Sequence, residues 1–384
     1  MAQPKNFGFG HEEQMVRDSL RKFLRDNAGV EKLRSLVASD HEKAYEAQTP
    51  PLAWDEKLWR GLVDLGLNAL AVPEVHGGAG MKMVAVAAVA EEIGRFALPS
   101  PLSATLIATS VLRHSEGKGA GRLLSRIAGG ASAALAVTNS EGSWNPEDAG
   151  VVATGAGGAE TVLNGTACFV QDARKADCFV VSARGEDGVG LYAVDADTPG
   201  LSVHPDHIVD LTRDQARVAF EAVELGTSDV IAAAGDGVDA LAAALPEILT
   251  IVAADICGAA EWQLQTTAEY ARTRVQFDRP LAFFQAVKHP IVDMMLAIDR
   301  ARSLVYAAAC AIDSDPDDAE RLARMAKSAA SDTAAYCSGR SVQLHGGIGF
   351  TWECDLHIYF KRQKHSQVLY GDAAWHRAQL ALRA

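Results

Sequence analysis

This chain has few cysteines, and they are scattered along the sequence. Its 384 residues include six cysteines, and none of them forms a Cys-x-x-Cys pair or lies near a histidine at the spacing of a zinc site. The sequence therefore predicts no metal centre. We expect the cysteines to be small apolar packing residues of a protein that works in a reducing compartment.

Basic residues and uninterrupted apolar runs are scarce as well. Lys and Arg number 36 against 49 Asp and Glu, so the formal net charge is −13, opposite in sign to that of a nucleic-acid-binding surface. The first ten residues hold no apolar core of a signal peptide, and charges interrupt the longest apolar stretches. We expect a cytoplasmic protein with no nucleic-acid partner and no membrane span.

Three common catalytic signatures are missing. No glycine cluster matches Gly-x-Gly-x-x-Gly or Gly-x-x-x-x-Gly-Lys-Ser/Thr between a strand and a helix, and Gly-x-Ser-x-Gly does not occur. The sequence thus argues against a Rossmann dinucleotide site, a P-loop and a serine hydrolase.

What is present divides the chain into three parts. Residues 11–126 repeat apolar side chains at helical spacing, and residues 133–231 alternate short β-branched and aromatic runs with Gly, Asn and Asp turns, which is typical of antiparallel β structure. Long helices are then predicted over 245–274, 287–314 and 317–344. The predicted domains are an N-terminal helical domain (1–128), a middle β domain (129–232) and a C-terminal helical bundle (233–384).

Two motifs in the C-terminal half point to chemistry. One is Arg274-Val275-Gln276-Phe277 at the end of the longest predicted helix, and the other is Gln343-Leu344-His345-Gly346-Gly347. A guanidinium pairs with phosphate, and adjacent glycines let a ligand approach the backbone closely. Taken singly, Arg274 fits the negative end of a helix equally well, and the glycines fit a helix C-cap.

Together with Val72-Pro73-Glu74, Gly77-Gly78-Ala79-Gly80 and Glu91-Glu92-Ile93-Gly94, these motifs resemble the acyl-CoA dehydrogenase family, in the family's order and over almost the whole chain. The resemblance implies an N-terminal helical domain, a middle antiparallel β-barrel domain and a C-terminal four-helix bundle. It also implies FAD bound in extended form at a subunit interface. The implied reaction is oxidation of the Cα–Cβ bond of an acyl-CoA thioester, with electron-transfer flavoprotein as electron acceptor.

The same resemblance implies roles for particular residues. Arg274 would contact the FAD pyrophosphate, with Phe277 in the same motif. Two later residues, Leu281 and Gln285, would line the adenosine portion of FAD. The second motif would approach the FAD of the neighbouring subunit through Gln343, Gly346 and Gly347. The implied assembly is a homo- or heterotetramer.

The usual catalytic base of the family is missing. Many members carry a glutamate before a glycine near the C-terminus, and here Tyr370 precedes Gly371. A phenol with an ordinary pKa near 10 is a poor base at neutral pH. Other members place the glutamate at the start of the long C-terminal helix, where an ungapped count matches Ile248 and the carboxylate Glu247 lies next to it. Our prediction for the base is Glu247, brought into register if Pro246 starts the helix one residue differently. The alternative is that Glu247 only favours the positive end of the helix.

Two flavin contacts also depart from the family pattern. In the stretch 137–144 only Thr138 matches, and the strand Phe169-Val170-Gln171-Asp172 has lost its hydroxyl, although the Gln171 amide can still donate a hydrogen bond. Such departures resemble actinobacterial members that act on bulky or steroid acyl-CoAs and pair two unlike subunits. Three hypotheses stay open: a dehydrogenase that uses Glu247, a non-catalytic subunit that completes an FAD site, and a flavin monooxygenase on the same fold.

Overall fold

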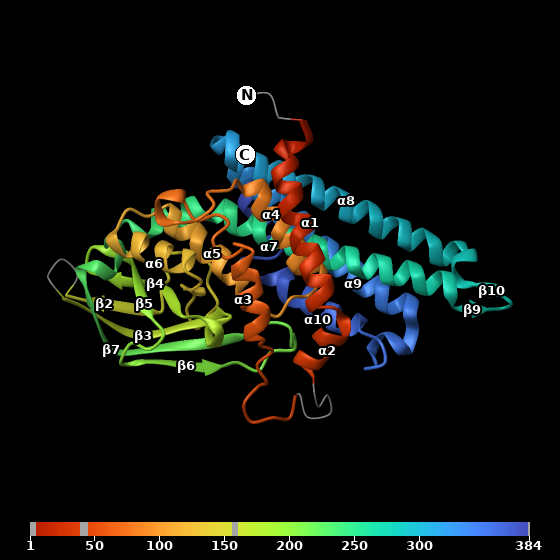
Figure 1. Cartoon of the computed structure of the whole chain (residues 1–384), viewed down its shortest axis with the longest axis horizontal. Coiled ribbons are helices and arrows are strands. Elements are labelled where there is room, and N and C mark those ends of the chain that lie inside the picture. The colour runs from red at the N-terminus through yellow and green to blue at the C-terminus, as the bar shows by residue number, and fades with distance from the viewer. Residues whose placement is uncertain (1–4, 39–44, 156–159, 383–384) are drawn as a thin grey trace.

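The computed structural model describes residues 5–38, 45–155 and 160–382, and it has three parts (Figure 1). The N-terminal part is helical, as predicted. Its helix after residue 55 ends where Gly66 adopts a left-handed φ of 73°, which is the expected C-terminal signal. The helices of this part are η1 (Lys5–Gly8), α1 (His11–Asn27), α2 (Val30–Val37), α3 (Glu56–Asp64), η2 (Glu74–His76), α4 (Met83–Arg95), α5 (Leu102–Arg113) and α6 (Lys118–Ala128).

The middle part is one sheet with the strand order β6-β7-β3-β2-β4-β5-β8, and β1 also pairs with β4. Most pairs are antiparallel, as predicted, but β1 and β2 both run parallel to β4. Helices α5 and α6 cover one face (Figure 1), so β4 and β5 are buried almost continuously. The elements are β1 (Ala133–Ala136), β2 (Val151–Thr154), β3 (Glu160–Gln171), η3 (Ala173–Lys175), β4 (Cys178–Gly185), β5 (Gly188–Asp195), β6 (Leu201–Pro205), β7 (Gln215–Gly226), η4 (Thr227–Asp229) and β8 (Val230–Ala232).

The C-terminal part is a bundle of long helices, and a short hairpin projects from its far end (Figure 1). The three-part architecture predicted from the sequence is confirmed, with a mixed sheet in place of a purely antiparallel one. The predicted domain boundaries fall in the connections after α6 and after β8. The elements are α7 (Gly237–Thr273), β9 (Val275–Gln276), β10 (Arg279–Pro280), η5 (Leu281–Phe283), α8 (Gln285–Ser314), α9 (Pro316–His345), η6 (Gly346–Phe350), α10 (Leu356–Val368) and α11 (Ala373–Ala381).

Helix α7 starts earlier than the sequence predicts. It begins at Gly237 and continues through Pro246, because the buried side chains of Ala240, Leu241 and Ala244 hold its first turns in the core, and this packing outweighs the cost of an interior proline. By length and composition α7 would be able to cross a membrane, but 83% of its most apolar window is buried inside the molecule. It is therefore the central core helix of this fold.

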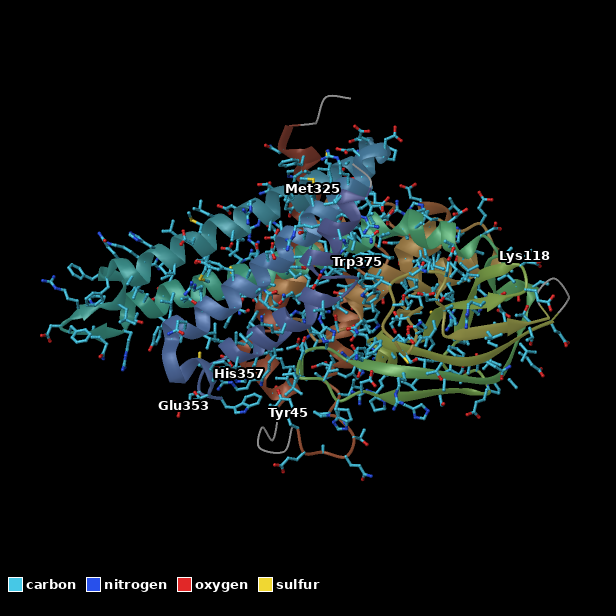
Figure 2. All side chains as sticks on the ribbon, turned by 180° about the vertical axis from the view of Figure 1, so that it is seen from behind. Tyr45, Lys118, Met325, Glu353, His357 and Trp375 are labelled. Carbon is cyan, nitrogen blue, oxygen red and sulfur yellow. The ribbon has the colours of Figure 1, made fainter. Side chains whose placement is uncertain are left out.

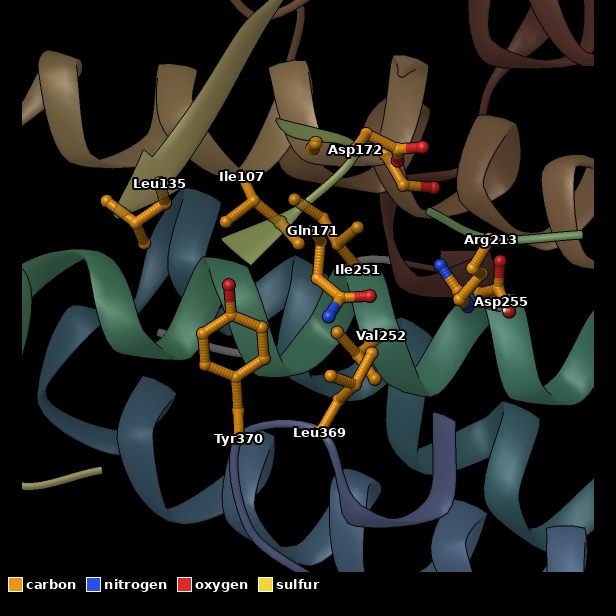
Figure 3. Close-up of a pocket in the computed structure, with 12 residues that line it drawn as sticks. Ile107, Leu135, Gln171, Asp172, Arg213, Ile251, Val252, Asp255, Leu369 and Tyr370 are labelled. Atoms are coloured by element: carbon orange, nitrogen blue, oxygen red, sulfur yellow. Dashed lines mark hydrogen bonds and ion pairs between the residues drawn. The ribbon is translucent and has the colours of Figure 1, made fainter. Parts of the chain in front are cut away.

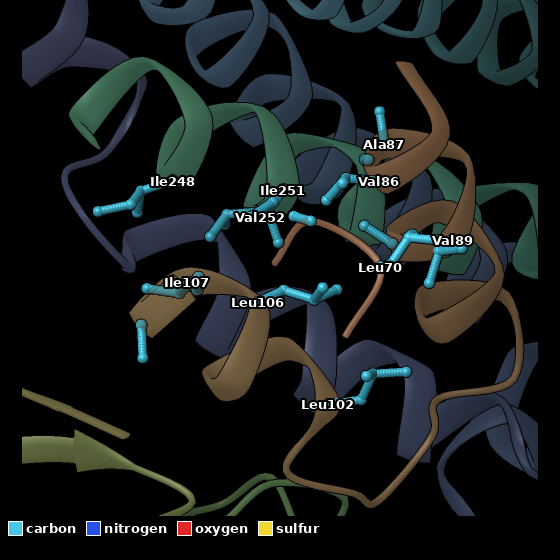
Figure 4. Close-up of a cluster of buried hydrophobic side chains, with 14 of the residues drawn as sticks. Leu70, Val86, Ala87, Val89, Leu102, Leu106, Ile107, Ile248, Ile251 and Val252 are labelled. Atoms are coloured by element: carbon cyan, nitrogen blue, oxygen red, sulfur yellow. The ribbon is translucent and has the colours of Figure 1, made fainter. Parts of the chain in front are cut away.

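The core centres on the crossing of α4, α5 and α7 (Figure 4). Two glycines let the backbones of α4 and α7 touch. A Cβ added at Gly94 would lie 1.9 Å from the Asp255 carbonyl oxygen, and one at Gly258 would lie 1.8 Å from the Glu91 carbonyl oxygen. The family-like Glu91-Glu92-Ile93-Gly94 motif thus includes a packing residue.

The first and last parts of the chain also meet at the surface. Seen from behind, Tyr45 and His357 lie on the same side of the molecule (Figure 2). Lys361 joins them, because its Nζ donates to Tyr45 Oη at 2.8 Å and lies 3.3 Å from His357 Nδ1. This contact fixes α10 against the segment that follows α2.

Candidate functional site

The FAD-binding residues predicted on the two C-terminal motifs lie at the far end of the bundle, where α7 and α9 end. The Tyr270 ring stacks on the His345 ring with centroids 4.3 Å apart, and this contact holds the two motifs side by side. The Arg274 side chain is exposed, and it forms no ion pair with any described residue. Phe277 on the hairpin is 85% exposed. An unpaired guanidinium and an uncovered aromatic ring are open to an external partner.

The glycines of the second motif support the same reading. Gly346 has a left-handed φ of 68°, which favours glycine for conformational reasons alone. Gly347 has no such requirement, and a Cβ added there would meet no described atom within 4 Å. Packing inside the described chain therefore does not explain Gly347, whereas close approach of a ligand to the backbone would. Gln343 is exposed beside it, and on the α8 side Gln285 is exposed and Leu281 is partly buried.

Of the other predicted site residues, Gln171 lines a cavity between α5, α7, the end of β3 and the turn after α10 (Figure 3), whereas Thr138 and Glu247 do not. The cavity holds about 20 Å³, which is room for about one water molecule. Tyr370 points into it, and the Trp144 ring packs against the Tyr370 ring at a tilt of 35° with centroids 4.7 Å apart. Burial raises the pKa of Tyr370 above its ordinary value, so even less of the phenolate that could act as a base is present at neutral pH than the sequence suggested.

Gln171 lies in the cavity wall, but the protein already uses its amide. Its Nε2 donates to Gln215 Oε1 at 2.9 Å, and its Oε1 lies 2.9 Å from His365 Nε2. Thr138 is 4% exposed and forms an isolated bridge with Cys168. The Gln171 amide is therefore not free toward the cavity, and Thr138 is not among the residues that line it.

Each acidic residue that lines the cavity is paired with a cation. The Asp255 carboxylate accepts from Arg362 at 2.5 Å and from Arg213 at 3.0 Å, and the Asp172 carboxylate accepts from Lys175 at 2.9 Å. Burial acts to raise the pKa of Asp255, but the two guanidinium charges outweigh it and hold that pKa below its ordinary value. Asp255 is therefore a permanently charged structural anchor.

Glu247, the predicted base, is not among the residues that line the cavity. It is buried, and its carboxylate oxygens lie 2.9 Å from His114 Nε2 and 3.3 Å from Arg113 Nη1. Helix α7 is continuous from Gly237, so the predicted shift of register at Pro246 does not occur. Ile248 packs on the same helix face as Ile251 and Val252, which do line the cavity (Figure 4), and Glu247 is turned away by about 100°.

The two groups of site residues are far apart within one chain. Asp255 at the cavity and Thr273 beside Arg274 are separated by 18 residues of α7, which is about 27 Å of helix. The end of α7 thus offers an exposed guanidinium that pairs with no described residue, while the cavity is nearly full.

Comparisons with known proteins agree with this fold. The acyl-CoA dehydrogenase N-terminal domain matches residues 10–131, and the acyl-CoA dehydrogenase C-terminal domain matches residues 235–384. The chain therefore belongs to the acyl-CoA dehydrogenase family, the oxidoreductases that oxidise acyl-CoA with FAD.

Among its relatives is acyl-CoA dehydrogenase IpdE2 of Mycobacterium tuberculosis, which is 34% identical over 91% of this chain and 90% of the relative. Among solved structures, a variant of the Tcur3481–Tcur3483 steroid ACAD is 30% identical, covers 96% of both chains and has a TM-score of 0.83. The ChsE4–ChsE5 complex from Mycobacterium tuberculosis shares the fold, with a TM-score of 0.85 at 24% identity over 98% of this chain and 97% of that chain.

Sequence reasoning missed what fills the cavity. Gln171 contacts Gln215 and His365, and Tyr370 contacts the Trp144 ring. These partners lie on separate segments of the chain, and no local spacing in the sequence connects them. The one sequence feature that pointed to a changed cavity was the absence, at the end of β3, of the hydroxyl residue that the family usually has there. No cluster of potential metal ligands occurs among the described residues.

Proposed function

We propose that this chain is the FAD-site-completing subunit of a heteromeric acyl-CoA dehydrogenase, and that a homologous partner chain supplies the catalytic base. One observation carries the proposal. The cavity beside Tyr370 has room for about one water molecule, whereas small-molecule sites typically occupy about 300–1,000 Å³. An acyl chain and a flavin ring require a site of the larger kind, so the open site belongs to the partner.

The residues at the end of the bundle fit FAD. Arg274 would pair with the pyrophosphate, because a guanidinium stays charged and donates two parallel hydrogen bonds to phosphate oxygens. Gly346 and Gly347 would let the backbone approach the cofactor, and Phe277 and Gln343 would flank it. When bound, FAD supplies the acceptor for the hydride that leaves the β-carbon.

The missing base supports the assignment to a partner. The reaction needs a carboxylate that takes the α-proton while the β-hydrogen leaves as hydride. In this chain the acids at the cavity are held by Arg362, Arg213 and Lys175, and Tyr370 has a raised pKa. A glutamate of a homologous chain, at the position of Tyr370 or of Ile248, would complete the reaction.

The test is to purify the chain alone and together with a homologous chain that carries this glutamate. We expect no stoichiometric flavin in the chain alone and about one FAD per two chains in the mixture, with the flavin bleached by acyl-CoA without oxygen. Arg274→Ala should weaken FAD binding by about ten- to a hundredfold, because a charged hydrogen bond contributes about 1.5–3 kcal/mol. Full flavin occupancy and anaerobic bleaching of the chain alone would refute the proposal, and rapid reoxidation by air would favour a monooxygenase.

A second candidate is a self-sufficient dehydrogenase that uses Glu247. It is favoured by the position of Glu247, a buried carboxylate on α7 next to Ile248. It requires that Glu247 leave Arg113 and His114 when substrate binds. Glu247→Gln would then abolish acyl-CoA-dependent flavin reduction with FAD still bound, whereas in a partner-dependent enzyme the same variant would keep activity.

The substrate, acceptor and compartment complete the proposal. A bulky acyl-CoA, such as a steroid-derived one, is supported by the likeness to a solved steroid ACAD. Electrons would pass to electron-transfer flavoprotein in a tetramer. All six cysteines are free thiols in the structure, which agrees with the reducing cytoplasm.

A further inference from the structure

Helix α9 carries a lysine that is fully buried against the turn after α10. Lys327 is 0% exposed. Its Nζ donates to the Gly371 carbonyl at 2.7 Å, to Ser331 Oγ at 2.8 Å and to the Gln367 carbonyl at 3.1 Å. It takes part in no ion pair with the described carboxylates. A buried cation held only by neutral oxygens is costly, so its position calls for an explanation.

The three acceptors match the protonated amine and not the neutral one. An ammonium group has three N–H donors, and the structure gives each of them one oxygen. The Ser331 hydroxyl in turn donates to the Gln367 carbonyl at 3.0 Å. A neutral amine has two donors and a lone pair, so the Ser331 hydroxyl would have to turn from the Gln367 carbonyl to Nζ, and the cluster would lose one hydrogen bond. The arrangement therefore depends on the proton.

The segment that Lys327 holds forms one wall of the cavity. Gln367 and Gly371 flank Leu369 and Tyr370, and both of these line the cavity (Figure 3). Tyr370 and Gly371 have left-handed φ angles of 54° and 97°. Such a conformation is costly for tyrosine and persists only when the surroundings enforce it. The two carbonyl contacts of Lys327, one on each side of the turn, enforce it.

Burial and the groups around Lys327 bring its pKa close to neutral pH. Burial lowers its pKa to about 7, and Asp372 on the turn acts weakly in the other direction. His376 on α11 also faces it and has a pKa lowered by burial to about 3, so this imidazole is neutral. Arg324 on α9 is paired with Glu320, and Arg377 on α11 is paired with Asp332.

We propose that Lys327 is a positioning residue whose ammonium group latches the turn 367–371, so that Leu369 and Tyr370 close the cavity, and that loss of its proton releases this turn. The device goes beyond the proposed function, since it concerns this chain's own cavity and not the FAD-binding end. At mildly acidic pH the cavity is closed, and at alkaline pH its wall becomes mobile.

Hydrogen exchange of peptides covering residues 367–376 tests the latch at pH 6 and pH 8.5, after correction for intrinsic exchange rates. In the wild-type protein we expect protection of this segment to fall by about tenfold between the two pH values, as for loss of one hydrogen bond to a charged group. Lys327→Met should remove the pH dependence. Lys364→Met is the matched control, because Lys364 is exposed on α10 near Gln367 and should leave the wild-type behaviour unchanged.

Two further variants keep the test decisive if Lys327→Met does not fold. Lys327→Arg cannot lose its proton, so the segment should stay equally protected at both pH values. Ser331→Ala removes one acceptor of the ammonium group, so release should occur at lower pH than in the wild type. Equal protection of the wild-type turn at pH 6 and pH 8.5, or an undiminished pH dependence in Lys327→Arg, would overturn the proposal.

Discussion

Asp255→Asn should destabilise this protein more than any surface substitution of the same kind. Asp255 is 2% exposed and joins α7 to two other parts of the molecule. Its carboxylate accepts from Arg362 on α10 and from Arg213 in the loop before β7. The amide would remove the negative charge while leaving two buried guanidinium groups in place.

The expected magnitude follows from this burial. Removing one partner of a buried ion pair costs about 3–5 kcal/mol, because the remaining charge is left without compensation. The entropy of unfolding, about 2.1 cal/mol/K per residue, amounts to about 0.8 kcal/mol/K for 384 residues. The melting temperature should therefore fall by about 4–6 °C. Because the pKa of Asp255 is lowered in the folded state, its stabilisation is present above about pH 4 and is lost as pH falls below that value.

Calorimetry at pH 7 measures this effect directly. Asp332→Asn is the matched control, since Asp332 pairs with Arg377 at 2.8 Å but both side chains are more than half exposed. Exposed pairs contribute about 0–1 kcal/mol, so the control should melt within about 1 °C of the wild type. Equal melting temperatures for the two variants would refute the claim that the Asp255 pairs hold the domains together.

Three further outcomes follow from the structure. Gly258→Ala should cost about 1–3 kcal/mol in urea unfolding, because its Cβ would lie 1.8 Å from the Glu91 carbonyl oxygen; an unchanged midpoint would contradict the close contact of α4 and α7. Stability should rise with pH between about 4 and 6.5, because His376 stays neutral in the fold and protonates on unfolding, and His376→Asn should reduce that slope by about 1.4 kcal/mol per pH unit. Glu247→Gln should lower stability by about 1–3 kcal/mol through its lost pairs with Arg113 and His114, and a neutral effect would mean that these pairs are not maintained in solution.

Much of the fold could be predicted because its signals are local. Apolar spacing and capping residues locate α8 and α9 within a few residues, since a helix is specified by neighbours in sequence. The parallel pairing of β1 and β2 with β4 could not be predicted. This pairing joins strands that are separated by other elements in the sequence. The sequence of a single strand does not determine which other strand it pairs with.

The candidate site divides in the same way. The Arg274 and Gln343 motifs are short contiguous runs, so their family resemblance is visible in the sequence. The contents of the cavity depend on Trp144, Gln171 and Tyr370 meeting from separate segments. The prediction of Glu247 as base relied on a helix start at Pro246, and the packing of the first turns of α7 excludes that start.

The middle and the C-terminal end of α7 place different demands on a partner. At Arg274 the chain exposes a cation that pairs with no described residue, and the nearby Phe277 ring is 85% exposed although the Phe284 ring contacts it. Exposed groups of this kind contribute little to the stability of the isolated chain. At Asp255 every charge is paired and the neighbouring cavity is closed, which stabilises the chain but leaves no room for a substrate. In a homodimer of such chains, the exposed groups around Arg274 of one chain would face the closed cavity of the other chain at every interface. Under the proposed function, the cavity that faces Arg274 in an active interface would therefore belong to a chain of different sequence.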